Sequence, residues 1–239
     1  MDTIKINKHN SRMVAHRGLS GLEPENTMAA FIAAANRDYF GIETDVHVTA
    51  DGHFVVIHDD DTGRVSDEKL SVEQSTLARL QLVQLNDRSG HPRSDLRIPT
   101  LAEYLQVCAR YGKVAVLELK NAFTREHIEK MLEIVRANIA DDLMIYISFD
   151  YNNMKILREL LPEATLQFLT ADHVDDAMIE KLKAYRLDLD IYFSRLTEEN
   201  IALLHANGIR INCWTADDPV RAQRRAEWGV DFITSNILQ

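Results

Sequence analysis

The sequence has little cysteine and no long apolar run. Its two cysteines, Cys108 and Cys213, lie in a helix-like and a strand-like segment without CxxC spacing, so we expect reduced, packed thiols and neither a disulfide nor a zinc site. No segment approaches the roughly 18 uncharged apolar residues of a membrane span, and the N-terminal residues lack the apolar stretch of a signal peptide. We therefore expect a soluble, cytoplasmic protein without stable membrane association.

Basic residues are also fewer than acidic residues. Lys and Arg number 27 against 37 Asp and Glu in 239 residues, which gives a formal net charge of -10. Such a charge repels nucleic acid and anionic surfaces unless a local basic pocket intervenes, so we expect no nucleic-acid partner. The rest of the composition, 46% hydrophobic and 27% charged, is typical of a soluble globular domain.

Strand-like runs alternate with helix-like segments along most of the chain. Eight strands in βα order, in a chain close to the roughly 250 residues typical of the fold, predict a TIM (β/α)8 barrel. An open doubly wound sheet, the main alternative, would ordinarily carry a GxGxxG turn after its first strand, and the sequence has none. The strand-like runs are RMVAHRG, GIETDVHVT, KVAVLELK, LMIYISF, TLQFLT, LDIYF, IRINCWT and VDFITS.

One interval breaks the alternation. Residues 60–99 are polar and rich in Asp, Ser and Arg, with one short amphipathic piece, SVEQSTLARLQLV. We interpret them as a small insertion on the barrel rim after the second strand. Because no sharp boundary separates it from the rest, we expect residues 1–239 to form a single TIM-barrel domain.

Carboxylates interrupt two of the strand-like runs. Side-chain alternation turns Glu43 and Asp45 of the second strand, and Glu118 and Lys120 of the third, toward the barrel interior. Active sites of TIM barrels form at the carboxyl ends of the strands, where the three acids would converge. Their repulsion is relieved if they bind a divalent cation, and oxygen ligands favour Mg²⁺, Ca²⁺ or Mn²⁺ over zinc. Lys120 could instead offset one charge or hold an anionic ligand.

A histidine follows these acids after a hairpin. If Asp51-Gly52 forms a two-residue loop, the ladder brings His58 opposite Asp45 and onto the same face. A register shifted by one residue would pair His58 with Thr44 and turn it away from the acids. We expect the first register.

His16 and Arg17 end the first strand, which lies beside the second. With His58, they complete a set of two imidazoles for proton transfer, one guanidinium for an oxyanion and a carboxylate cluster for a metal. Phosphate-ester chemistry needs groups of these kinds. The set therefore indicates an enzyme acting on a phosphate ester.

These residues lie in motifs that occur in a fixed order. The motifs are AHRG (15–18), PENT (24–27), ETDV (43–46), TADGHFVVIHD (49–59), IPTLAEYL (98–105), LELK (117–120) and CWT (213–215). In this order the chain resembles the glycerophosphodiester phosphodiesterase family, from about Val14 to about Thr234. The family is a TIM-barrel, metal-dependent hydrolase with an insertion after the second strand.

The resemblance implies cleavage of small glycerophosphodiesters to glycerol 3-phosphate and an alcohol. In the mechanism usually drawn for the family, a glycerol hydroxyl attacks phosphorus and expels the alcohol, and water then opens the cyclic phosphate. The implied roles are His16 and His58 as the general acid/base pair in an unassigned order, Arg17, Lys120 and Trp214 as substrate-binding residues, and Glu43, Asp45 and Glu118 as metal ligands.

The chain departs from the family pattern after two of these motifs. Ala216-Asp217 follows WT where many members carry Val-Asn, and TSNILQ ends the chain where many read Thr-Asp and then Pro. We expect neither departure to affect the catalytic residues. Two other functions stay open: a phospholipase of the sphingomyelinase D or phosphoinositide-specific type, which needs an apolar rim, and a phosphodiester-binding barrel without catalysis.

Overall fold

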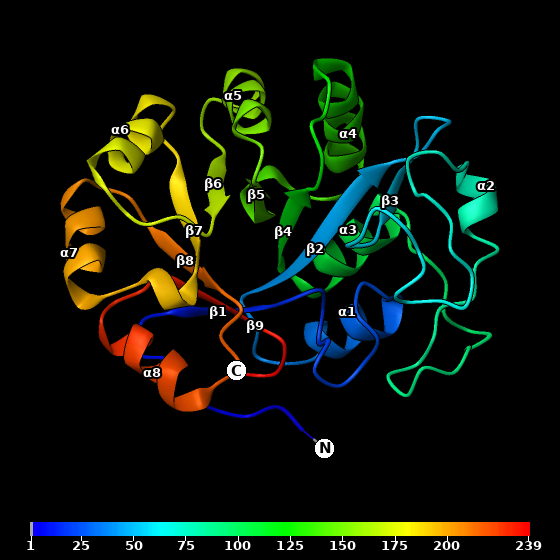
Figure 1. The fold of residues 1–239 in the computed structure, drawn as a ribbon, viewed down its shortest axis with the longest axis horizontal. Helices are drawn as coiled ribbons and strands as arrows, with labels where there is room; N and C mark the ends of the chain where they lie inside the picture. Colours follow the sequence, from blue (N-terminus) through cyan, green and yellow to red (C-terminus); the bar gives the residue numbers. More distant parts are fainter. Residues whose placement is uncertain (1) are drawn as a thin grey trace.

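The structure, a computed structural model that describes residues 2–239, is a closed parallel barrel surrounded by helices (Figure 1). The strands follow one another around the barrel, and β1 pairs with both β2 and β9, so the sheet closes on itself. This confirms the predicted TIM barrel. The parallel strands are β1 (Arg12–Ala15), β2 (Gly41–Val48), β4 (Val114–Leu119), β5 (Met144–Ser148), β6 (Thr165–Thr170), β7 (Asp188–Tyr192), β8 (Ile211–Trp214) and β9 (Phe232–Ser235).

Helices connect the strands and cover the outside of the barrel (Figure 1). Most begin at a Thr or Asp whose side chain accepts a backbone N–H of the first turn, as Thr100 and Thr197 do in capping boxes. The helices are α1 (Met28–Ala35), α2 (Leu77–Leu80), α3 (Leu101–Tyr111), α4 (Arg125–Asn138), α5 (Tyr151–Leu160), α6 (Asp176–Ala184), α7 (Glu198–Ala206) and α8 (Pro219–Glu227), with the short 3₁₀ helices η1 (Asp141–Leu143) and η2 (Phe193–Arg195).

Side-chain alternation along the strands divides the core into two layers. Ile42 and Leu117 belong to the large outer cluster between strands and helices, whereas Val116 and Phe232 belong to a second cluster inside the barrel. Complete burial of such side chains contributes about 1.5–3 kcal/mol each. Glu118 continues the inward row of Val116, so the carboxyl ends of the strands carry polar groups above an apolar interior, as predicted.

The predicted register of the first hairpin is wrong. Val48 of β2 pairs with Phe54 of the antiparallel strand β3 (Phe54–Val56), and this register would bring His58 opposite Thr44. The loop spans residues 50–52 because Gly52 adopts a left-handed conformation, with φ of 77°, which suits a three-residue hairpin loop. His58 nevertheless faces the acids, because β3 ends before it and the chain bends out of the ladder.

Residues 60–99 lie between β3 and α3 at one edge of the barrel, where Figure 1 draws them in cyan and green. They are largely irregular, with α2 as a single helical turn, and they contribute to a small separate apolar cluster. The segment begins just after His58, so it starts at the carboxyl end of the barrel. Within residues 2–239, no helix is long and apolar enough to cross a membrane.

Candidate active site

Glu43, Asp45 and Glu118 form the centre of the site. Their side chains are buried, and one carboxylate oxygen of each lies within 4.8 Å of the others. Asp45 and Glu118 are register partners of β2 and β4. Burial and the charges of its two neighbours raise the pKa of Glu43 well above its usual value, and burial and Asp45 raise the pKa of Glu118 to about 7.

The cluster fits a hard divalent cation. All its donors are carboxylate oxygens, and Asp45 Oδ1 is buried without a hydrogen-bond partner. Lys120 Nζ donates to Glu118 Oε1 at 2.8 Å and lies 3.5 Å from Asp45 Oδ1. Lys120 therefore offsets part of the charge in this structure, which was one of its two predicted alternatives, while its contact with substrate stays a prediction.

Arg17 lies beside the acids in a left-handed backbone conformation, with φ of 53°. Its backbone N–H donates to Glu43 Oε2 at 2.7 Å, and its Nη1 donates to Glu25 Oε1 at 2.8 Å. Its Nε lies 3.5 Å from Asp45 Oδ2 and is buried without a hydrogen-bond partner. The guanidinium is thus held between two acids, with Nη1 paired to Glu25 and Nε directed at Asp45.

His16 contacts the C-terminal residues of the chain. Asn236 Oδ1 lies 2.7 Å from His16 Nδ1 and also accepts from Ser20 Oγ at 2.6 Å, while Asn236 Nδ2 donates to Asp217 Oδ2 at 2.5 Å. Because an amide oxygen only accepts, this network assigns the proton to Nδ1 and leaves Nε2 free, 4.0 Å from Glu43 Oε2. Burial, followed by the charge of Arg17, lowers the pKa of His16 to about 4.

The network at His16 corrects one expectation. Asp217 and Asn236 belong to the two segments that depart from the family pattern, and neither segment was expected to affect the catalytic residues. Asp217 accepts from the backbone N–H and the side chain of Asn236, which contacts His16 directly. The expectation is wrong because β1 and β9 are neighbours, so the chain end after Ser235 lies beside His16.

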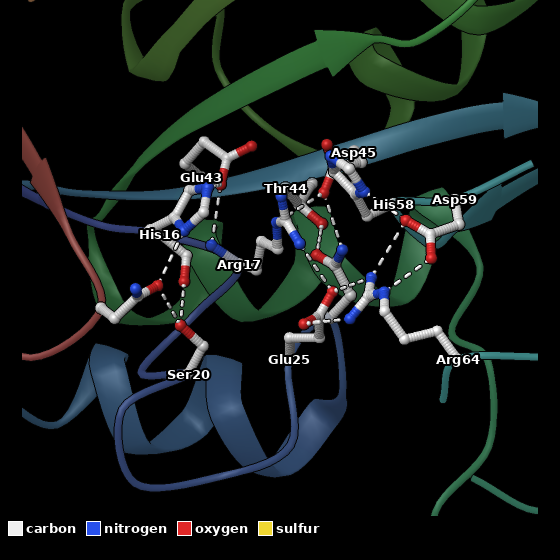
Figure 2. A network of polar contacts seen from close by, with 12 residues as sticks. His16, Arg17, Ser20, Glu25, Glu43, Thr44, Asp45, His58, Asp59 and Arg64 are labelled. Atoms are coloured by element: carbon white, nitrogen blue, oxygen red, sulfur yellow. Dashed lines mark hydrogen bonds and ion pairs between the residues drawn. The ribbon is translucent and has the colours of Figure 1, made fainter. Parts of the chain in front are cut away.

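His58 lies on the other side of the acids, held by a carboxylate (Figure 2). Its Nδ1 lies 2.6 Å from Asp59 Oδ1, and Asp59 Oδ2 accepts from Arg64 Nε at 2.6 Å. His47 is buried, and its Nε2 lies 3.3 Å from the backbone oxygen of His58. Burial lowers the pKa of His58, although Asp45 and the hydrogen bond to Asp59 oppose this effect.

The two histidines open into one cavity of about 60 Å³. On the side of β5–β9 it is lined by apolar and aromatic groups together with Asp190 and Thr234, and Trp214 packs edge-on against Phe149 with ring centroids 5.6 Å apart. Trp214 Nε1 and Asp190 Oδ1 are buried there without hydrogen-bond partners. Of the predicted site residues, all but Asp45 and Lys120 line this cavity. Asp45 pairs with Arg17 and Lys120, and Lys120 also pairs with Glu118.

Sequence reasoning missed several residues of the site. Asn26 enters the sequence analysis only as part of the motif PENT, yet its Nδ2 donates to Asp45 Oδ2 at 2.8 Å, and the neighbouring Thr27 caps α1. Asp59 directly follows His58, and this adjacency could have identified it. Asp190 could have been found from the alternation in LDLDIYF, which turns it toward the interior.

Comparison with known proteins agrees with this geometry. The sequence profile of the Glycerophosphoryl diester phosphodiesterase family matches residues 16–238. A glycerophosphodiester phosphodiesterase of Bacillus altitudinis is 29% identical over 228 residues, which cover 93% of this chain and 93% of the relative. A phosphodiesterase of Oleispira antarctica, solved in complex with the product sn-glycerol-3-phosphate, superposes with a TM-score of 0.87 at 27% identity and covers 95% of this chain and 93% of its own.

A crystal structure of a glycerophosphodiester phosphodiesterase from Parabacteroides distasonis is also similar, with a TM-score of 0.79, 26% identity and coverage of 96% and 94% of the two chains. The profile match includes His16, both acids of β2, His58 and Glu118. The chain therefore belongs to the glycerophosphoryl diester phosphodiesterase family of enzymes.

Proposed function

We propose that the protein hydrolyses glycerophosphodiesters to glycerol 3-phosphate and an alcohol, with a divalent metal ion and with His16 and His58 as the acid/base pair. The observation that carries the proposal is the common cavity, which both histidines, Arg17, Glu43 and Glu118 line. Membership in the family supports the reaction class. The small volume of the enclosed space suits a small polyol better than an acyl chain.

The arrangement allows an in-line reaction in two steps. In the first, a glycerol hydroxyl forms a bond to phosphorus while the bond to the alcohol oxygen breaks; one histidine takes the hydroxyl proton and the other gives a proton to the leaving oxygen. In the second, water attacks the cyclic phosphate and the two protons move in the reverse direction. Arg17, whose side chain lines the cavity, binds a phosphoryl oxygen through its guanidinium, and Trp214 contacts the glycerol portion.

A divalent cation would be held by Glu43, Asp45 and Glu118 and would stabilise charge on the phosphoryl group as a Lewis acid. The contacts of the histidines support a division of their roles. His16 is bound by a neutral amide, and its lowered pKa keeps it unprotonated, so it serves as the base at Nε2. His58 is bound by the carboxylate of Asp59, which opposes the lowering of its pKa by burial and stabilises an imidazolium, so it serves as the acid.

A coupled assay for glycerol 3-phosphate tests the reaction. Glycerophosphocholine and glycerophosphoethanolamine are supplied with EDTA, Mg²⁺, Mn²⁺ or Ca²⁺, and release of choline from lysophosphatidylcholine tests the phospholipase alternative. We expect metal-dependent release and a loss of about 10²–10⁴-fold in His16→Ala and His58→Ala, while His53→Ala in the exposed hairpin stays active. If glycerophosphocholine shifts the melting temperature of the protein but no glycerol 3-phosphate is released with any metal, the proposal is refuted.

The leaving group separates the two histidines. In a glycerophosphodiester of p-nitrophenol, the p-nitrophenolate leaves without a proton. His58→Ala should therefore lose far less activity in the first-turnover release of p-nitrophenolate than with glycerophosphocholine. His16→Ala should lose the same activity with both substrates, because the attacking hydroxyl still has to be deprotonated. The reverse pattern would exchange the two roles.

A further inference from the structure

We propose that Arg64, in the segment of residues 60–99, is a positioning residue that couples Arg17 to His58. The inference rests on the proposed function, because it assigns Arg64 a role through the groups that bind phosphate and transfer protons. Arg64 does not line the catalytic cavity, so it acts through other residues.

The guanidinium of Arg64 holds two carboxylates at once (Figure 2). Its Nη1 and Nη2 donate to the two oxygens of Glu25, both at 2.8 Å. Its Nε and Nη2 donate to the two oxygens of Asp59, at 2.6 and 3.1 Å. Two bidentate pairs fix the plane of the guanidinium and the orientation of both carboxylates.

Each of these carboxylates also contacts a residue of the proposed catalytic machinery. Glu25 Oε1 accepts from Arg17 Nη1 at 2.8 Å, and Asp59 Oδ1 lies 2.6 Å from His58 Nδ1. A continuous chain of charged hydrogen bonds thus runs from Arg17 through Glu25, Arg64 and Asp59 to His58. Arg64 is its centre, and it comes from a segment outside the regular barrel.

Loss of Arg64 would act on both ends of this chain. Glu25 would keep Arg17 as its partner but lose the clamp on its other side, and Asp59 would be free to rotate away from the His58 ring. The side chain of Arg64 is 46% exposed, so the pairs are screened by solvent and should add little to global stability. Catalysis is more sensitive, because small displacements of positioned groups slow a reaction strongly.

Arg93 offers a matched control within the same segment. It also forms a bidentate pair, from Nε to Asp95 Oδ1 at 3.0 Å and from Nη2 to Asp95 Oδ2 at 2.5 Å, and its side chain is 39% exposed. Within the described residues, the Arg93 side chain forms no hydrogen bond or ion pair with a residue of the site. Arg93→Gln therefore measures the effect of removing an exposed bidentate arginine without the coupling.

The kinetic test compares Arg64→Gln, Arg64→Lys and Arg93→Gln by turnover of glycerophosphocholine and by melting temperature. We expect Arg64→Gln to lower kcat about 10–100-fold, as second-sphere changes typically do, with a melting temperature close to that of Arg93→Gln. Arg64→Lys should stay impaired, because an ammonium cannot form two bidentate pairs. Full activity of Arg64→Lys would show that charge alone suffices and would overturn positioning.

Coupling is tested by combining Arg64→Gln with Asp59→Asn. If Arg64 acts through Asp59, the double variant should be little worse than the more impaired single variant. The inference would be overturned if the losses of kcat in the two single variants multiplied in the double variant, or if the kcat of Arg64→Gln equalled that of Arg93→Gln. The proposed function would still stand, since the wild type would hydrolyse the substrate.

A spectroscopic measurement makes the result independent of turnover. In protein labelled with ¹⁵N-histidine, the Nδ1 proton of His58, assigned with His58→Ala, reports its bond to Asp59. We expect this resonance to shift or broaden in Arg64→Gln and to stay in place in Arg93→Gln. An unchanged resonance in both variants would refute the coupling even if the enzyme proved to act on another substrate.

Discussion

Replacement of Glu118 by glutamine should have opposite effects on stability with and without divalent metal. In the metal-free protein, burial and Asp45 raise the pKa of Glu118 from 4.5 to about 7. The folded state then binds more protons than the unfolded state between these values, so stability falls as pH rises through this range and stays lower above it. At about 1.4 kcal/mol per pKa unit, the ionised carboxylate costs the metal-free fold about 3 kcal/mol at pH 8.

Glutamine removes this cost but keeps an oxygen that can accept from Lys120 Nζ. The weaker bond to a neutral acceptor offsets about 1 kcal/mol, which leaves a gain of about 2 kcal/mol. For a chain of this length, each kcal/mol moves the melting temperature by about 2–4 °C, so in EDTA at pH 8 we expect a rise of about 4–8 °C. At pH 4 Glu118 is mostly protonated in both states of the wild type, so most of the gain should vanish.

Saturating metal should reverse the sign of the difference in stability between Glu118→Gln and the wild type. A metal ion present at about 100 times its dissociation constant stabilises the folded wild type by about 2.7 kcal/mol. Glu118→Gln lacks one of the carboxylates that bind the metal, so it should lose much of this stabilisation. Differential scanning calorimetry in EDTA and in Mg²⁺ or Mn²⁺ measures both conditions. Glu133→Gln, an exposed position on α4, serves as the control and should change little in either. A Glu118→Gln variant that melts below the wild type in EDTA at pH 8 would refute the electrostatic reasoning.

Three further changes test separate features. Asn236→Ala removes the acceptor at His16 Nδ1 and should lower kcat about 10–100-fold in the glycerophosphocholine assay; unchanged kcat would contradict its role in orienting the ring. Asp190→Asn should raise the melting temperature more at pH 8 than at pH 4, because burial and Glu118 raise the pKa of Asp190; an equal effect at both pH values would contradict this. Cys108 and Cys213 are buried, and burial raises the pKa of both, that of Cys108 to about 12, so a disulfide reagent should label them only after denaturation; rapid labelling of the native protein would show that they are accessible.

The barrel could be predicted because its signals are local and repeated. The segments Val114–Leu119 and Leu101–Tyr111 show why: one is a short run of mostly apolar residues, and the other carries a capping box at Thr100 and a left-handed Gly112 after its last turn. Inward orientation of Glu43 and Glu118 follows from the period of two along a strand. These features need no knowledge of distant contacts.

The environment of the histidines could not be predicted in the same way. The hairpin register depends on a loop one residue longer than expected, which no periodicity reveals. The contact between His16 and Asn236 joins residues 220 positions apart and exists only because the first and last strands close the barrel. Glu25 and Arg64 are 39 positions apart in irregular segments, where side-chain direction has no regular rule.

The two histidines share one cavity but are bound by different acceptors, and this difference has a chemical consequence. An amide oxygen accepts the Nδ1 proton of His16 without favouring the charged ring, whereas the carboxylate of Asp59 favours a charged His58. The amide is fixed by Asp217 and the carboxylate by Arg64, so each acceptor is itself held by a charged partner. Unequal proton affinities follow from this arrangement, and a reaction that removes a proton from one oxygen while supplying one to another needs such a pair.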